Sequence, residues 1–410
     1  MSRVNSRVRQ PSRIQLARVS SQLAGSCASV LQDHLTRLRG VGDHANRVLH
    51  YDQLLTAHLL GFYDTVVRSL RTLDARTVSG DAMKASLDNL RLARSTISDA
   101  MAELPAEALL PLLKELLARL PANCAHPDLA DLMTLKKRIC AIDGSYFRVP
   151  ADVLWALTHT RSNGKPGRQV RLDLHLDVLR FLPVAGRVDG QEQSSESQAF
   201  IATLEAGVVY LADRNFVDFA FLHAVRDVGS DFVVRLKKDN KVVAFADNAL
   251  TAGDKEAGVL QDQQVRIPGT RWASGFGDAS FRVVVVFDPV RRQEVRLLTT
   301  LLDVPAEMIG KLYRHRWAIE LFFRWLKCVA KIKHLFSQSP NGITMQFYVV
   351  IIATLLMYLR TGSRPSIYCM VMLSSAASGD LCLEKVPEVL QRIARERELE
   401  RLRRAKKKQR

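Results

Sequence analysis

The stretch R-I-C-A-I-D at residues 138–143 marks the point where the character of the chain changes. Four apolar residues between an arginine and an aspartate are typical of a short buried strand, and the Gly-Ser pair that follows predicts a turn. Asp143 is therefore expected at the C-terminal end of a strand. V-V-Y-L-A-D at residues 208–213 predicts the same position for Asp213. The two aspartates are expected to converge, because the carboxyl ends of mainly parallel strands face one crevice.

The residues around these two stretches alternate between strand and helix patterns. Residues 169–178 and 180–189 repeat apolar residues every second position, which predicts two long antiparallel strands. Helices are predicted at about 197–205 and 216–229, and a strand at 231–237. The order strand, strand, strand, helix, strand, helix, strand predicts an α/β core built on a mixed sheet.

A β-rich insertion follows this core. No helical pattern is found in residues 239–302, whereas residues 265–272, 281–288 and 294–301 resemble strands with turn residues at their joints. A long helix is then predicted from Pro305 to about residue 336, since proline is favoured in the first turn.

Helices are also predicted at both sides of the core. Residues 14–120 have helical periodicity, and Pro121 marks the boundary. The longest apolar run, residues 347–359, has 13 residues, which is too short to span a bilayer. It predicts a buried core helix at about residues 343–361.

Four polar residues, Tyr313, Arg316, Glu320 and Lys327, are spaced by 3, 4 and 7 residues in the helix after the insertion. On a continuous helix they fall within an arc of about 60°. A narrow polar stripe among many aromatic residues favours a functional site. Arg324 lies near the same arc, so the salt-bridged edge of an amphipathic helix is the alternative.

These residue types suit one kind of chemistry. Two strand-end aspartates and a helix glutamate are oxygen ligands of the kind that Mg²⁺ prefers, and two such ions can activate a nucleophile and stabilise a leaving oxygen. Arginine and lysine grip phosphate, and tyrosine stacks on nucleotides. The sequence thus predicts phosphodiester chemistry on DNA or RNA, although either aspartate taken singly also fits a helix-cap or turn acid.

The charge of the chain supports a polyanionic partner. The 410 residues are 47% hydrophobic, which excludes a disordered chain, and carry a net charge of +17. Residues 1–20 contribute +5 and residues 392–410 contribute +7. Such ends predict arms that bind the nucleic-acid backbone, with solvated tails as the alternative.

Cysteine usage favours a reducing compartment. The six cysteines form no C-x-x-C pair and have no histidine at zinc-site spacing, which argues against disulfides and structural zinc. No secretory signal is predicted, while the Arg- and Ser-rich start also fits an organellar transit peptide. A cytoplasmic protein without a membrane partner is expected.

Here the sequence resembles a known family. Y-R-H-R-W-A-I-E-L-F-F-R-W-L-K at residues 313–327 matches Y-x2-R-x3-E-x6-K, the signature of the bacterial insertion-sequence-four type transposases. I-D-G-S (142–145) and L-A-D-R-N-F (211–216) are similar to the two aspartate boxes of that family. The resemblance covers about residues 135–361.

The resemblance implies a DDE transposase with an RNase H-like catalytic core. It implies cut-and-paste movement in the bacterial cytoplasm, at the nucleoid when bound to DNA, with nicking, often a hairpin, and strand transfer by a homodimeric synapse on double-stranded DNA, the terminal inverted repeats and the target. Two Mg²⁺ ions, replaceable by Mn²⁺, are the implied cofactors. The implied metal ligands and catalytic residues are Asp143, Asp213 and Glu320, and the implied DNA contacts are Tyr313, Arg316 and Lys327.

The resemblance also suggests how the chain is divided. The core is expected at residues 135–238 and 303–362, interrupted by a β-strand insertion domain at 239–302. Residues 1–125 are assigned to a helical domain that binds the terminal repeats, by position and charge alone, and residues 363–410 to a C-terminal segment with a basic tail.

Two positions depart from the family pattern. Asn215 stands where many relatives have glycine, and asparagine also tolerates the left-handed backbone of a tight turn. Trp272, the single tryptophan of the insertion, has no certain counterpart in the base-stacking tryptophan of some relatives.

Two other functions fit the same residues. An RNase H-like nuclease that only hydrolyses needs the same acids but gives little reason for a separate helical region and an insertion. A domesticated or inactive relative would use its basic surface to bind DNA, but the presence of all three acids and the whole stripe disfavours it.

Overall fold

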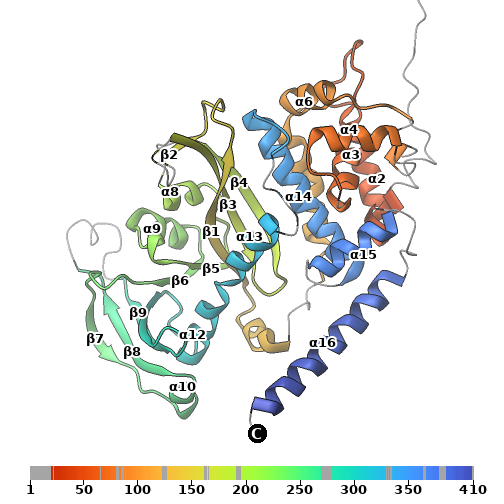
Figure 1. The fold of residues 1–410 in the computed structure, drawn as a ribbon. Coiled ribbons are helices and arrows are strands. Elements are labelled where there is room, and N and C mark those ends of the chain that lie inside the picture. The colour runs from red at the N-terminus through yellow and green to blue at the C-terminus, as the bar shows by residue number, and fades with distance from the viewer. Residues whose placement is uncertain are drawn as a thin grey trace, which may run out of the picture. The chain divides into compact units, whose positions relative to one another are not determined.

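The structure is a computed structural model, and the described residues form two compact units, each considered by itself (Figure 1). The first unit comprises Met1–Pro121, Arg148–Trp155 and Trp325–Arg410, and the second comprises Ala122–Phe147 and Ala156–Arg324. The described residues are 20–408 except 22, 65, 80–82, 85–86, 88, 122–126, 161–163, 165, 191–194, 269–278, 329, 331, 333–334, 363–365 and 378–384.

The described part of the first unit is mainly helical, which confirms the helical region predicted before Pro121. Its α-helices are α2 (Ala28–Leu38), α3 (Tyr51–Tyr63), α4 (Leu70–Ser79), α6 (Arg94–Glu103), α7 (Leu110–Ala118), α14 (Pro340–Thr361), α15 (Ile367–Ala377) and α16 (Val386–Lys408). Two short 3-10 helices, η1 (Gly25–Cys27) and η2 (Ala106–Leu109), precede α2 and α7.

Helix α14 is the core of the first unit and packs against α3, α6 and α7 (Figure 1). The Ser339 hydroxyl caps its first turn by accepting the Gly342 N–H at 3.0 Å, and Gly362 ends it at φ +62°. By length and composition α14 could cross a membrane, but 83% of its most apolar window is buried in the protein. The predicted buried core helix is therefore confirmed.

The second unit is built on one ten-stranded sheet. Its core strands are β1 (Arg138–Val149), β3 (Pro166–Asp177), β4 (Leu182–Asp189), β5 (Val208–Ala212) and β6 (Asp231–Arg235). They lie in the order β4-β3-β1-β5-β6, with β1, β5 and β6 parallel and β3 antiparallel to β4. With α8 (Glu196–Ile201) and α9 (Phe219–Asp227) between the later strands, this is the RNase H-like mixed sheet expected from the sequence.

The strands of the insertion extend this same sheet. β10 (Gln293–Thr299) pairs antiparallel with β6, and β9 (Phe281–Asp288), β8 (Val259–Arg266) and β7 (Val243–Asp247) follow in order. The expectation that residues 239–302 contain no helix is wrong, because α10 (Ala252–Glu256) forms there. A reciprocal capping box between Thr251 and Asp254 stabilises this single turn, which is too short to produce a periodic apolar pattern.

The structure adds further short elements to the second unit. Strand β2 (Leu157–Thr160) pairs with the start of β3, and the 3-10 helices η3 (Pro127–Leu135) and η4 (Arg214–Phe216) precede β1 and α9. Trp272 lies outside the described residues. The four-part division of the chain stays a prediction.

The turn predicted after Asp143 is wrong, because β1 continues through Asp143 to Val149. The parallel pairing with β5 ends near Ala141, but β1 remains extended beside β3. A Gly-Ser pair favours a turn only where no neighbouring strand holds the chain extended. Gly144 has another role here, since a side chain at this position would collide with its neighbours.

The single long helix predicted from Pro305 to residue 336 is also wrong. Two helices form instead, α12 (Ala306–His315) and α13 (Ala318–Cys328). The Arg316 and Trp317 N–H groups bond to carbonyls three residues back, the tighter 3-10 pattern, so the helix is overwound at the joint. No glycine or proline marks this joint, so propensity gave no signal for it.

Candidate acidic active site

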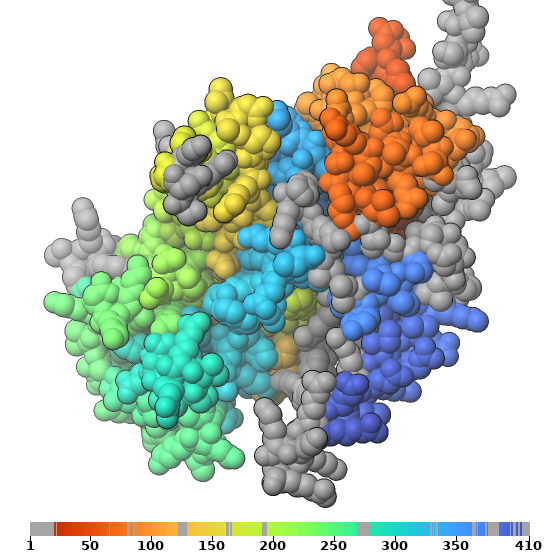
Figure 2. Space-filling model, viewed as in Figure 1, coloured from red at the N-terminus to blue at the C-terminus, as the bar shows by residue number. Residues whose placement is uncertain are grey.

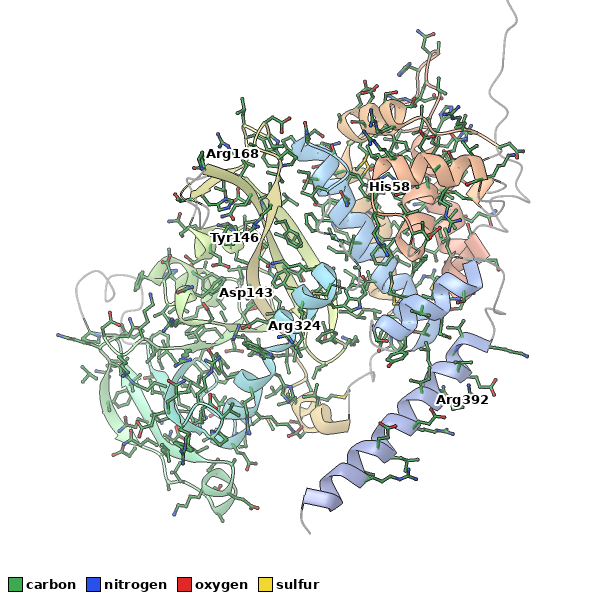
Figure 3. All side chains as sticks on the ribbon, viewed as in Figure 1. His58, Asp143, Tyr146, Arg168, Arg324 and Arg392 are labelled. Carbon is green, nitrogen blue, oxygen red and sulfur yellow. The ribbon has the colours of Figure 1, made fainter. Side chains whose placement is uncertain are left out.

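Asp143 lies in the middle of β1 and is the best-described member of the site (Figure 3). Its Oδ1 accepts the N–H of Gly144 at 3.0 Å. The pKa of Asp143 is raised to about 7, first by burial and then by the negative charge of Glu196, with Asp213 acting in the same direction and the charge of Arg316 opposing the rise. The structure thus brings the two predicted aspartates and Arg316 within electrostatic range of one another.

Asp213 directly follows β5, as predicted, and begins η4. Its Oδ1 accepts the N–H of Asn215 at 2.7 Å. One oxygen therefore acts as a helix cap, the alternative considered for a strand-end acid, while the residue still lies near Asp143. Asn215 sits in the right-handed turn of η4 and is absent from the described residues with positive φ, so this position needs no glycine.

Glu320 and Arg316 form an ion pair at the start of α13. Arg316 Nη2 donates to Glu320 Oε1 at 2.6 Å, and the Arg316 side chain is only 12% exposed. Burial would lower the pKa of Arg316, but the hydrogen bond to Glu320 and the charges of Tyr313, Glu320 and Asp143 raise it. Glu320 thus joins the aspartates through Arg316.

Tyr313 ends up beside the same arginine although it lies on α12, across the joint. The Arg316 guanidinium lies 5.9 Å from the centre of the Tyr313 ring. Burial raises the pKa of Tyr313, the charges of Arg316 and Arg235 oppose that rise, and the charge of Asp213 adds to it. Tyr313, Arg316 and Glu320 are therefore neighbours, although the continuous helix used to predict the stripe does not exist.

Lys327 is half-buried in the last turn of α13, which passes into the first unit at Trp325. Its role at the site stays a prediction. The exposed side of this helix pair carries apolar surface as well, since Trp317 is 40% and Leu321 is 41% exposed. In the space-filling view the segment of α12 and α13, in cyan, reaches the molecular surface (Figure 2).

Glu196 is the site residue that the sequence analysis missed. It is the first residue of α8, and its Oε1 accepts the Gly144 N–H at 2.6 Å. Burial raises the pKa of Glu196, with the charges of Asp173 and Asp213 in the same direction, against the Gly144 hydrogen bond and the charge of Arg171. Its only sequence signal was Ser195 as a helix cap, because residues 190–196 are uniformly polar. We call Asp143, Asp213, Glu196 and Glu320 the acidic site.

A second group of charged residues lies in the sheet next to the acidic site. Arg171 donates through Nε and Nη2 to both oxygens of Asp173, at 2.6 and 3.1 Å, and through Nη2 to Asp189 at 3.0 Å. All three residues are at most 5% exposed. We call these three residues the paired cluster.

The donors of the acidic site suit a hard divalent cation. They are carboxylate oxygens, partly desolvated, whose mutual repulsion already raises the pKa of Asp143. Among the described residues, no three Asp, Glu, His or Cys side chains stand close enough to hold an ion as arranged here. Glu320 is bound to Arg316 instead. The oxygen atoms of these acids are therefore suitable ligands for such an ion, but Glu320 is bonded to Arg316 in this structure.

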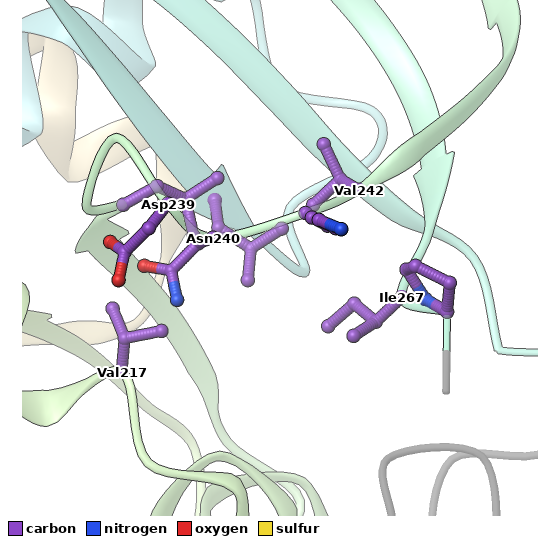
Figure 4. A pocket seen from close by; sticks show the side chains of 9 residues that line it. Val217, Asp239, Asn240, Val242 and Ile267 are labelled. Atoms are coloured by element: carbon purple, nitrogen blue, oxygen red, sulfur yellow. The ribbon is translucent and has the colours of Figure 1, made fainter. Parts of the chain in front are cut away.

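A separate cavity of about 260 Å³ lies at the turn between β6 and β7 (Figure 4). Val217, Asp239, Asn240, Val242 and Ile267 are among its lining residues. None of the residues predicted for catalysis or DNA contact lines it.

The strand order and the acidic site together define the class: an RNase H-like fold with carboxylates on β1, after β5 and on a later helix. Residues 134–356, more than half of the chain, match the family described as transposase DDE domain. The chain belongs to this family. The family implies the use of divalent metal in general.

Individual relatives are transposases by name. A putative transposase, y4zB, of Sinorhizobium fredii is 28% identical over 204 residues, which cover 48% of this chain and 54% of the relative. A probable transposase for insertion sequence element IS5377 of Geobacillus stearothermophilus is 24% identical over 265 residues, 64% of this chain and 66% of the relative. The chain thus spans about half to two thirds of the length of these curated relatives.

One solved structure is also similar. It is the cryo-EM structure of the piggyBac transposase synaptic complex with hairpin DNA, which has 10% sequence identity and a TM-score of 0.40 and covers 90% of this chain and 80% of that chain. At this level of likeness, nothing about the present chain rests on it.

Proposed function

We propose that this protein is a DNA transposase that moves an insertion sequence by cutting DNA at its ends and joining the cut ends to target DNA. The observation that carries the proposal is the meeting of Asp143, Asp213 and the Arg316–Glu320 pair in a chain of the transposase DDE family. The named relatives support the same activity.

The proposed cofactor is a pair of Mg²⁺ ions, for which Mn²⁺ would substitute. Asp143, Asp213 and Glu320 would hold them, with Glu320 released from Arg316. When bound, such ions lower the pKa of an attacking water or hydroxyl and stabilise the leaving oxygen. The protein contributes a partly desolvated pocket, in which charge interactions are stronger than in water.

Tyr313, Arg316 and Lys327 are the proposed contacts to the transposon end. Arg316 is suited to a phosphate because its guanidinium can exchange one oxyanion, Glu320, for another without leaving its place over Tyr313. Tyr313 would orient that guanidinium or contact the nucleotide itself. Lys327, two turns after Glu320, would add a point charge for the backbone.

The proposed partners are the terminal inverted repeats and a target duplex, brought together by a homodimer. The helical region before Pro121 is the proposed reader of the repeats, and the +5 and +7 ends of the sequence would hold the DNA backbone. A cytoplasmic site of action next to the nucleoid accompanies this proposal.

The experiment is a joining assay. Purified full-length protein is incubated with labelled DNA that carries the short inverted repeats found next to the reading frame, a supercoiled target plasmid, and Mg²⁺, Mn²⁺ or EDTA. We expect metal-dependent cleavage at the repeat ends and covalent joining to the plasmid.

Two results would replace the proposal by another function. Metal-dependent cleavage without joining would identify a hydrolytic nuclease. Salt-sensitive DNA binding without any cleavage would identify an inactive relative that only binds DNA.

A further inference from the structure

The structure places a fourth carboxylate in the acidic site. The single N–H of Gly144 donates to Asp143 Oδ1 at 3.0 Å and to Glu196 Oε1 at 2.6 Å. The two acids lie more than fifty residues apart in the chain, on β1 and α8. Two carboxylates on one donor repel each other unless a cation lies near both.

The position of Glu196 is built into the backbone. Ser195 caps the start of α8, and the Ser197 hydroxyl donates to Asp218 Oδ2 at 2.6 Å, which ties α8 to the start of α9. A Cβ at Gly144 would lie 2.5 Å from Glu196 Oε1. Glycine at this position therefore leaves room for the carboxylate to reach the strand next to Asp143.

Two arginines near the acidic site already have carboxylate partners, although the charge of Arg171 also acts on Glu196. Arg171 lies beside Gly144 but donates to both oxygens of Asp173 and to Asp189. Arg316 is bound to Glu320. Neither arginine has a hydrogen bond to Glu196 among those found in the described residues.

We propose that Glu196 is a fourth carboxylate of the catalytic site, whose charge beside Asp143 strengthens the binding of the divalent cation. This inference rests on the proposed function, because it assigns Glu196 to the same ion site. A helix-capping or merely structural role needs only an oxygen that accepts the Gly144 N–H, whereas the proposed role needs the negative charge.

The substitution Glu196→Gln separates these roles. Glutamine keeps the size of the side chain and an oxygen for the Gly144 N–H, but it removes the charge. We expect Mn²⁺ affinity of the full chain, measured by isothermal titration at pH 8, to fall about tenfold or more. The melting temperature in EDTA is expected to stay unchanged or to rise, because the repulsion with Asp143 is relieved.

Glu294→Gln is the matched control, because Glu294 is an exposed glutamate on β10 of the same sheet. It makes the same charge change away from the site, so its Mn²⁺ affinity should stay close to that of the unsubstituted chain. Glu196→Ala, which also loses the acceptor, should weaken Mn²⁺ binding at least as much as Glu196→Gln.

Several outcomes would overturn the proposal. Equal Mn²⁺ affinity of Glu196→Gln and the unsubstituted chain would show that the charge is not needed. A loss of affinity together with a lower melting temperature in EDTA would make Glu196 a structural residue. Neither measurement uses DNA, so the joining assay of the unsubstituted chain tests the proposed function separately.

Discussion

The acidic site and the paired cluster lie in the same sheet but differ in how their charges are balanced. In the paired cluster, one arginine serves two aspartates through hydrogen bonds of 2.6 to 3.1 Å, and all three residues are buried. In the acidic site, Arg316 bonds to Glu320, and the pKa of Asp143 is raised to about 7. In the first arrangement both aspartates accept hydrogen bonds from an arginine, whereas among the described residues the hydrogen bonds found for Asp143 and Glu196 in the second come from a backbone N–H.

This difference indicates which group is structural and which is functional. A buried aspartate with a bidentate arginine needs nothing further, as Asp262 also illustrates with Arg282 at 2.6 and 2.7 Å in the insertion strands. Carboxylates kept together without enough cations reduce stability, and such arrangements concentrate at functional sites. Removing a carboxylate charge from the acidic site should therefore abolish activity without loss of stability. Removing the arginine of the paired cluster should instead lower the free energy of unfolding.

The largest expected effect is the loss of cleavage when the acidic site loses one charge. Asp143→Asn should reduce DNA cleavage by about a thousandfold or more, equivalent to about 4 kcal/mol, because the site would lose a metal ligand. Asp213→Asn and Glu320→Gln should behave alike. The measurement is the cleavage rate of end-labelled repeat DNA in Mg²⁺.

Binding and stability provide the control for these variants. Gel-shift affinity for the repeat should stay within a few-fold, and the melting temperature in EDTA should not fall. If DNA binding were lost together with cleavage, the metal-ligand assignment would be contradicted.

The paired cluster should respond through stability. Arg171→Met leaves Asp173 and Asp189 buried without their partner, which typically costs about 3 to 5 kcal/mol. Urea unfolding of the full chain measures the loss. Arg291→Met, at an exposed arginine between β9 and β10, is the matched control and should cost less than about 1 kcal/mol. If Arg171→Met lowered the free energy of unfolding no more than the control does, the structural role of Arg171 would be refuted.

The basic end of the sequence is predicted to bind the DNA backbone through its positive charge. Residues 392–410 hold ten basic and three acidic residues. Deleting them should weaken DNA binding about tenfold or more at low salt and reduce the slope of log affinity against log salt, because fewer counterions are released. Fluorescence anisotropy from 50 to 300 mM salt measures both quantities. A deletion variant with the slope of the full chain would rule out the backbone-binding role.

Most of the core could be predicted from the sequence because its elements carry strong local patterns. The alternation of residues 169–178 and 180–189 gave β3 and β4, and the apolar stretch before Asp213 gave β5. The three acids were found because each follows or interrupts an apolar pattern, and the spacing around Glu320 matched a family signature.

The predictions that failed concern features that depend on contacts between residues far apart in the sequence. The continuation of β1 past Asp143 depends on β3 beside it, and the joint after His315 is an overwound turn that no propensity marks. Glu196 lies in a polar stretch and joins the site only because α8 packs back toward Gly144. A local pattern carries no information about such pairings.

The smallest expected effect is the pH dependence of the metal-free protein. The pKa of Asp143 rises from 3.8 to about 7 on folding, chiefly through burial and the charge of Glu196, so the folded state binds more protons between these values. Stability should therefore fall as pH rises from about 4 to about 7. Asp143→Asn removes this titration but leaves the paired cluster unchanged, so the difference between the two proteins reports the titration of Asp143.

The measurement is the melting temperature in EDTA. The value for the unsubstituted chain, relative to that of Asp143→Asn, should be lower at pH 8 than at pH 5. Excess Mn²⁺ should reduce that difference, because the cation replaces the proton as the counter-charge of Asp143. A difference that does not change with pH would mean that Asp143 is not short of positive charge, and the contrast between the two groups would lose its physical basis.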